Sequence, residues 1–210
     1  MGVALLKVRD LTVRRGRKIV LSGVDLDVEA GEIVALVGPN GCGKSSLMGS
    51  VVGLYEPRRG EVQIQGRSAW GPPDERADAR RAQGYLPGGA DGGDPMGFLH
   101  GRELWALVAA TRGAPPPTEE LRAALGLDEL AELTIEQMSL GQRRRACLAA
   151  AMLGPPPLLV LDEPDNGIDP ARIERLVELL VDHRAHGGVL LASHDPELLR
   201  RLDARVVALG

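Results

Sequence analysis

Residues 38–46 read Gly-Pro-Asn-Gly-Cys-Gly-Lys-Ser-Ser and follow directly on the apolar run Glu32-Ile-Val-Ala-Leu-Val37. The run has the length of a buried strand, and a helix is expected from Lys44 onward. A glycine-rich loop between a strand and a helix can point backbone N–H groups at phosphate oxygens. A joint that merely favours glycine explains neither Lys44 nor Ser45. The stretch therefore predicts a site for a nucleoside triphosphate.

Each residue type in this loop has a chemical use. Glycine permits the backbone angles and the close approach that the loop needs. The Lys44 ammonium can reach the β- and γ-phosphates and take part in catalysis, and the Ser45 hydroxyl can ligate Mg²⁺. The predicted nucleotide contacts in the loop are Gly38, Pro39, Asn40, Gly41, Cys42, Gly43, Lys44, Ser45 and Ser46.

The composition narrows the classes of protein to consider. The chain has 210 residues, of which 44% are hydrophobic and 26% charged, enough to bury a core without disulfides or a structural metal. Its net charge of −4 gives no reason to expect a nucleic-acid partner. The two cysteines, Cys42 and Cys147, form no metal-binding pattern. No apolar run approaches bilayer length and no signal peptide is recognised, so we expect a cytoplasmic protein.

Strand-like and helix-like segments alternate along the chain, which is typical of an α/β fold with a mostly parallel sheet. A turn at residues 14–17 predicts an antiparallel β part near the N-terminus, and residues 98–138 are mostly helical in pattern, which indicates an α-helical insert. Strands are predicted at 3–8, 10–13, 18–21, 24–28, 32–37, 61–65, 158–161, 189–192 and 205–209. Helices are predicted at 44–53, 74–81, 102–111, from Thr118, and at 141–153, 171–183 and 196–202, with a glycine-rich loop at 84–97.

Two acidic residues, Asp162 and Glu163, end the apolar run at 158–161. In an open α/β sheet the ligand lies at the carboxyl ends of the strands. Asp162 is suited to hold Mg²⁺, and Glu163 is suited to polarise an attacking water as a catalytic base. The alternative is an acidic pair that merely caps the strand before Pro164, and the phosphate-binding loop favours the catalytic interpretation.

His194 follows the next predicted strand, so we expect it at the same edge of the sheet. A lone histidine at a strand end is usually incidental. Its position beside the predicted acidic strand favours a role in catalysis, in which it hydrogen-bonds the γ-phosphate and helps to position the water.

A helix start precedes the acidic strand at residues 138–142, which read Met-Ser-Leu-Gly-Gln. Ser139 is the predicted N-cap, and its hydroxyl together with the helix N-terminus forms an anion site. Because the phosphates held by Lys44 already occupy one helix N-terminus, we expect the second site to serve another subunit.

In type and order these motifs resemble those of the nucleotide-binding subunit of ATP-binding cassette (ABC) transporters, from one end of the chain to the other. Residues 38–46 are similar to Walker A, residues 158–163 to Walker B and residues 139–142 to the signature motif. Residues 165–169, Asp-Asn-Gly-Ile-Asp, resemble the D-loop that includes Asp169, and His194 resembles the switch histidine.

The resemblance implies a P-loop NTPase core and an ATPase that uses ATP and Mg²⁺. Two cassettes, identical or different, would trap ATP between the Walker A of one and Ser139, Gly141 and Gln142 of the other. A separate integral membrane permease would be the further partner, with the chain peripheral on the inner face of the cell membrane.

The same resemblance implies one ABC ATPase domain over residues 1–210. Its nucleotide-binding core would comprise residues 1–88 and 139–210, and its helical subdomain would be the insert at residues 89–138.

Three positions depart from the family pattern. Arg15 replaces an aromatic residue that stacks on adenine, although a planar guanidinium can also stack. Leu140 replaces the first of two signature glycines. Gly88 stands where a glutamine follows the strand at 84–87, and Gln83 lies at the other end of that strand, too far to substitute. We expect an active ATPase whose turnover these changes can slow.

Two other functions stay open. One is a soluble ABC ATPase that acts on ribosomes or DNA, and the other is a weakly hydrolysing partner cassette of a heterodimer. The arginines at 143–145 predict a solvated or salt-bridged helix face with an acidic partner nearby, since cations in a first turn oppose the helix dipole. Direct nucleotide contact is the alternative for these arginines.

Overall fold

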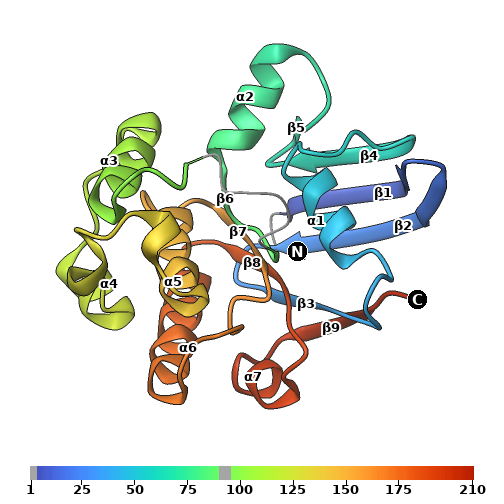
Figure 1. Ribbon diagram of the computed structural model, residues 1–210. Coiled ribbons are helices and arrows are strands. Elements are labelled where there is room, and N and C mark those ends of the chain that lie inside the picture. The colour runs from blue at the N-terminus through green and yellow to red at the C-terminus, as the bar shows by residue number, and fades with distance from the viewer. Residues whose placement is uncertain (1–3, 90–95) are drawn as a thin grey trace.

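Two β-sheets form the framework of the computed structural model, which describes residues 4–89 and 96–210 (Figure 1). One sheet has five strands in the order β6-β7-β8-β3-β9, and every neighbouring pair in it is parallel. Its strands are β3 (Ile33–Val37), β6 (Gln83–Leu86), β7 (Leu158–Asp162), β8 (Gly188–Ala192) and β9 (Arg205–Ala208). The predicted α/β fold with a parallel sheet is therefore confirmed.

The second sheet is antiparallel and has the order β2-β1-β4-β5. It comprises β1 (Ala4–Arg15), β2 (Lys18–Glu29), β4 (Arg59–Ile64) and β5 (Arg67–Ser68). The short separate strands predicted before residue 29 are wrong in length, because they merge into two strands of 12 residues each. The irregular β1–β2 register and the left-handed Asp10 (φ 49°) let one strand continue through the polar residues that suggested a break.

The predicted helices are confirmed, with ends shifted by a residue or two. They are α1 (Lys44–Val51), α2 (Pro73–Arg81), α3 (Gly101–Arg112), α4 (Glu119–Leu125), α5 (Leu140–Met152), α6 (Pro170–Arg184) and α7 (Pro196–Arg201), with short 3₁₀ turns η1 (Asp128–Leu130) and η2 (Ile135–Gln137). Local caps explain several starts. Thr118 accepts a hydrogen bond from Leu121 N, and Asp169 accepts one from Arg172 N.

The predicted loop at 84–97 is wrong over its first residues, because β6 pairs with β7 as far as Leu86, which agrees with the strand at 84–87 that the family resemblance implied. Gly84, at the start of this segment, indicates close packing and not a turn. A Cβ on Gly84 would lie 2.0 Å from the carbonyl oxygen of Ala151, so α5 can lie against β6 only where that strand has no side chain. Part of the predicted loop, residues 90–95, lies outside the described residues.

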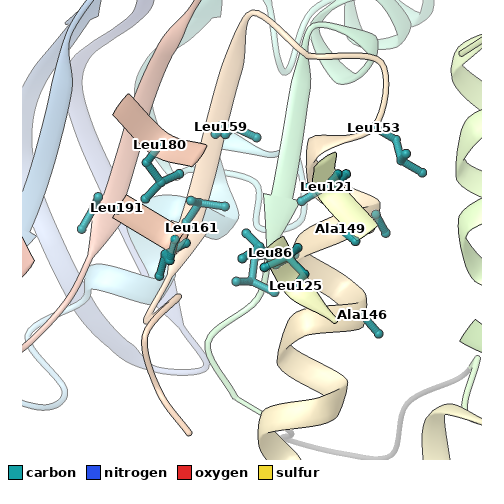
Figure 2. Close-up of a cluster of buried hydrophobic side chains, with 14 of the residues drawn as sticks. Leu86, Leu121, Leu125, Ala146, Ala149, Leu153, Leu159, Leu161, Leu180 and Leu191 are labelled. Atoms are coloured by element: carbon teal, nitrogen blue, oxygen red, sulfur yellow. The ribbon is translucent and has the colours of Figure 1, made fainter. Parts of the chain in front are cut away.

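Each face of the parallel sheet has its own hydrophobic core. Alternate strand residues such as Leu159, Leu161 and Leu191 pack against α3 to α7, and Figure 2 shows these leucines with Ala146 and Ala149 of α5. The intervening residues pack against α1 and the antiparallel sheet. Burial on both faces explains why β7 and β8 are unbroken apolar runs, each fully buried.

His183 of α6 makes stability depend on pH. The residue is 6% exposed, and burial lowers the pKa of its imidazole to about 4. The unfolded chain therefore binds more protons between about pH 6.5 and 4, so stability should fall as pH falls through that window. We expect a loss of about 1 kcal/mol from this residue between about pH 7.5 and 5.5. Urea unfolding of the wild type and of His183→Leu at both pH values measures this loss. An equal change in unfolding free energy between the two pH values in both proteins would contradict it.

Candidate functional site

The phosphate-binding loop lies between β3 and α1, as predicted. Three of its glycines are left-handed, with φ of 153° at Gly38, 81° at Gly41 and 108° at Gly43. Gly43 is the N-cap of α1, and a Cβ there would lie 2.7 Å from Leu21 Cδ2 of β2. All three positions favour glycine for its conformation, and Gly38 and Gly43 also lack space for a Cβ, so the spacing seen in the sequence has a structural cause.

Lys44 is 7% exposed, and its Nζ donates to Gly38 O at 2.7 Å and to Pro39 O at 3.3 Å. The ammonium is therefore held inside the loop. Beside it is a cavity of about 300 Å³ lined by Val20, Asn40, Gly41, Gly43, Lys44, Ser45, Ser46 and Glu163. The cavity joins most of the predicted loop contacts to the predicted base.

Asp162 ends β7 and is 2% exposed. Burial raises the pKa of its carboxyl, while a hydrogen bond with the Ser45 hydroxyl acts in the opposite direction. Its Oδ2 is buried without a hydrogen-bond partner. A buried carboxylate oxygen without a partner, next to a hydroxyl, is the ligand set that a hard divalent cation prefers, so Asp162 and Ser45 fit Mg²⁺.

Glu163 has a left-handed backbone, with φ of 53°, and its N–H donates to Ala192 O of β8 at 2.8 Å. Its carboxylate accepts a hydrogen bond from Asn166 Nδ2 at 3.2 Å and lies 3.7 Å from His194 Nε2. The predicted neighbourhood of Glu163 and His194 is confirmed, because β7 and β8 are adjacent parallel strands. The contact with Asn166 was not expected from the sequence.

Ser139 is the N-cap of α5, as predicted. Its Oγ accepts from Gln142 N at 3.3 Å, and Gln142 Oε1 accepts from Ser139 N at 2.9 Å. Gly141 lies against the D-loop, since a Cβ there would be 2.1 Å from Gly167 O. None of Ser139, Gly141 and Gln142 lines the phosphate-loop cavity within the described chain.

Two further predicted residues also lie away from that cavity. Arg15 places its guanidinium over the Tyr55 ring, 3.7 Å from the centroid. Asp169 caps α6 and pairs with Arg172 at 2.7 Å, and this hydrogen bond lowers the pKa of the Asp169 carboxyl. The D-loop is tied to the His194 segment at another point, where Ser193 Oγ donates to Asp165 Oδ2 at 3.0 Å.

Of the solvated or salt-bridged helix face predicted at residues 143–145, the solvated alternative is wrong for Arg144 and Arg145, which are 7% and 6% exposed, and the salt-bridged alternative is confirmed for Arg145. Arg145 donates to Leu125 O at 2.7 Å and pairs with Glu129 at 2.7 Å, so the expected acidic partner is confirmed. The reason is the central position of α5, which packs against both the sheet and α4. Arg144 precedes the buried Leu148 by one helical turn, a spacing that could have placed it inside.

Gly88 lies against the Asp162 carboxylate, since a Cβ at position 88 would be 2.5 Å from both Cγ and Oδ2 of Asp162. We expect Gly88→Ala to lower kcat severalfold, because the added methyl displaces the carboxylate. Gly88→Gln should lower kcat as well, although glutamine is the residue at this position in the family that the sequence resembles. Steady-state ATP hydrolysis measures both, with Gly89→Ala at the exposed neighbouring position as the control. Faster turnover in Gly88→Gln would contradict this.

Comparison with known proteins places the chain in a family. A family model described as ABC transporter matches residues 21–166. The cytochrome c biogenesis ATP-binding export protein CcmA of Novosphingobium aromaticivorans is 39% identical over 194 residues, covering 92% of this chain and 90% of its own. The zinc import ATP-binding protein ZnuC of Paramagnetospirillum magneticum is 35% identical over 210 residues, covering 99% of this chain and 74% of its own.

Solved structures agree with these relatives. An ATP-binding subunit of an ABC transporter has a TM-score of 0.87 at 31% identity and covers 98% of this chain and 86% of its own. A dimeric ATP-binding cassette in a post-hydrolysis state, bound to ADP and phosphate, has a TM-score of 0.79 at 25% identity, with 98% and 94% coverage. With its phosphate-binding loop, acidic strand end and cassette fold, the chain belongs to the ABC transporter family.

Proposed function

We propose that this chain is the ATP-hydrolysing subunit of a transporter and that the cavity between the phosphate-binding loop and Glu163 is where ATP is cleaved. The position of Glu163 supports this most strongly. The residue follows β7, far along the chain from the loop, yet it lines the same cavity as Lys44 and Ser45. A phosphate cradle and a base beside it are the parts that phosphoryl transfer to water needs.

In this proposal the loop N–H groups and the Lys44 ammonium hold the β- and γ-phosphates. Glu163 takes a proton from a water as the water oxygen forms a bond to the γ-phosphorus, and the proton is then released to solvent. The bond from that phosphorus to the bridging oxygen breaks, which leaves ADP and phosphate. His194, 3.7 Å from Glu163, donates a hydrogen bond to the γ-phosphate and orients the water.

Ser45 and Asp162 are the residues that would hold Mg²⁺. When bound, the cation supplies positive charge to the β- and γ-phosphate oxygens. Its charge also favours the ionised form of Asp162, whose pKa burial otherwise raises.

The transport function requires two kinds of partner. We assign Ser139, Gly141 and Gln142 to a half-site that faces the ATP of a second cassette, which explains why they lie outside the cavity of their own chain. None of the helices that the structure describes has the length and apolar character to cross a membrane. We assign the permease to a separate polypeptide and this chain to the cytoplasmic face.

The domain division follows the same assignment. Residues 1–88 and 139–210 form the nucleotide-binding core, and residues 89–138 form the helical subdomain. The α-helices of that segment that the structure describes, α3 and α4, share the hydrophobic core under the parallel sheet.

A second candidate is a weakly hydrolysing partner cassette of a heterodimer. Leu140 favours it, since this side chain is 56% exposed at the start of α5, where the second subunit would face. A bulky apolar residue there suits contact with a different cassette better than tight closure on a γ-phosphate.

Co-purification with ATPase measurement tests the transport function. The tagged chain is isolated in mild detergent from the organism that encodes it, and we expect an integral membrane protein to accompany it and to raise its ATPase rate. Ribosomes or DNA in place of that protein would favour the soluble alternative. A chain that hydrolyses ATP only when a second, different cassette is present would favour the heterodimer.

A further inference from the structure

Arg144 joins the ends of two parallel strands beside the candidate catalytic pair. Its Nε donates to Glu163 O at 2.9 Å, and its Nη2 lies 2.6 Å from both Asp162 O and Glu163 O. The same guanidinium donates to Gly88 O at 3.1 Å and to Pro87 O. All these acceptors are backbone carbonyls at the end of β7 or just beyond β6 and β7. Arg144 therefore contacts the backbone around the site and none of the carboxylates in it.

A guanidinium suits this task because its N–H donors project in one plane in a fixed fork. Peptide carbonyls that leave a sheet need hydrogen-bond partners when water is excluded. Here one buried side chain supplies them for both segments at once. A lysine ammonium is a compact charge on a flexible stem and cannot hold the same set of carbonyls in a plane.

The carbonyls that Arg144 holds belong to a strained segment. Glu163 has φ of 53°, a left-handed conformation that is unfavourable for a residue other than glycine. This conformation turns the chain at the end of β7 and lets the Glu163 side chain line the phosphate-loop cavity. A strained backbone persists only when surrounding contacts hold it, and here Arg144 supplies two of them.

No side chain at position 88 can make the connection that Arg144 makes. A Cβ on Gly88 would lie 2.5 Å from Asp162 Oδ2, so Gly88 approaches Asp162 as bare backbone. The link between this segment and the end of β7 therefore passes through the Arg144 guanidinium.

We propose that Arg144 is a positioning residue for hydrolysis, which holds the left-handed backbone of Glu163 so that its carboxylate faces the phosphate-loop cavity. It acts through Glu163 and does not touch ATP. The inference rests on ATP hydrolysis at this site. Its consequence is that Arg144 contributes to turnover and leaves ATP affinity unchanged.

The test compares Arg144→Lys and Arg144→Met with Arg145→Met in the otherwise complete chain, together with its membrane subunits. Arg145 is the matched control, since it is equally buried on the next position of α5 but holds the end of α4. We expect both Arg144 variants to lose about tenfold or more in kcat while the Kd for ATP stays within about twofold. Arg145→Met should keep kcat within about twofold at a temperature where it is folded.

A double variant shows whether Arg144 acts through Glu163. In single-turnover hydrolysis, adding Arg144→Met to Glu163→Gln should cause no further loss, because the group that Arg144 positions is already removed. Should Arg144→Met fail to fold, the same comparison with Arg144→Lys decides.

If the wild-type assembly hydrolyses ATP, three results would overturn the inference about Arg144 without overturning the proposed function. They are an unchanged kcat in folded Arg144 variants, a Kd for ATP that rises in step with the loss of kcat, and additive losses in the double variant. Absence of hydrolysis by the wild-type assembly would overturn the proposed function, and this inference with it.

Discussion

Glu163→Gln is expected to lower ATP turnover by about 10²–10⁴-fold while ATP stays bound. The amide has the size of the carboxylate and keeps the hydrogen bond with Asn166 possible, but it cannot draw a proton from water. The phosphate-binding loop is untouched, so affinity should not fall. Steady-state phosphate release and equilibrium binding of labelled ATP measure the two quantities.

The same variant tests the two-subunit arrangement. ATP that is bound and not cleaved should hold two cassettes together, so sedimentation of the variant with ATP should reveal a dimer. Glu136→Gln, an exposed acid outside the cavity, is the control and should turn over at the wild-type rate. Near-normal hydrolysis by Glu163→Gln would show that another group is the base. A persistent monomer, even with the membrane subunits and any sister cassette, would refute the half-site assigned to Ser139.

Lys44→Ala is expected to weaken ATP binding by about 10- to 100-fold, corresponding to roughly 1.5–3 kcal/mol for a hydrogen bond to a charged group. The ammonium now donates to Gly38 O and Pro39 O inside the loop, and the proposal transfers this donation to the phosphates when ATP enters. Its removal leaves the phosphate charge without its nearest cation. Isothermal titration with ATP measures the loss.

Lys18→Ala is the matched control, since Lys18 is an exposed lysine at the start of β2 and should bind ATP normally. Thermal unfolding without ligand should show Lys44→Ala folded, because lost binding counts only in a folded protein. Equal affinity in the wild type and Lys44→Ala would exclude the loop as the phosphate site.

The parts of the site that could be predicted are those whose chemistry is local in sequence. The loop, the cap at Ser139 and the acidic end of β7 each depend on a few consecutive residues with characteristic backbone requirements. The neighbourhood of Glu163 and His194 followed from parallel strands that end at one edge of the sheet. In each case the spacing along the chain already implies the geometry.

Other features depend on which elements pack together, and local patterns misled there. The glycines of residues 84–97 suggested a loop, yet Gly84 pairs with Leu159 in β6, and its missing side chain lets α5 approach the strand. Three consecutive arginines suggested a solvated or salt-bridged helix face, yet Arg144 is buried and donates to backbone carbonyls at the ends of β6 and β7. Backbone carbonyls at strand ends need such a donor only after the strands have packed together.

Order along the chain thus sufficed to identify the fold class, the phosphate-binding loop and the acidic pair, since strand and helix periodicity and glycine chemistry operate over a few residues. Packing between distant segments determined three other features. They are the cavity shared by Lys44 and Glu163, the close approach of Gly88 to Asp162, and the hydrogen bonds from Arg144 to Glu163 O. Burial and carbonyl geometry are properties of the assembled sheet, and no single segment carries them.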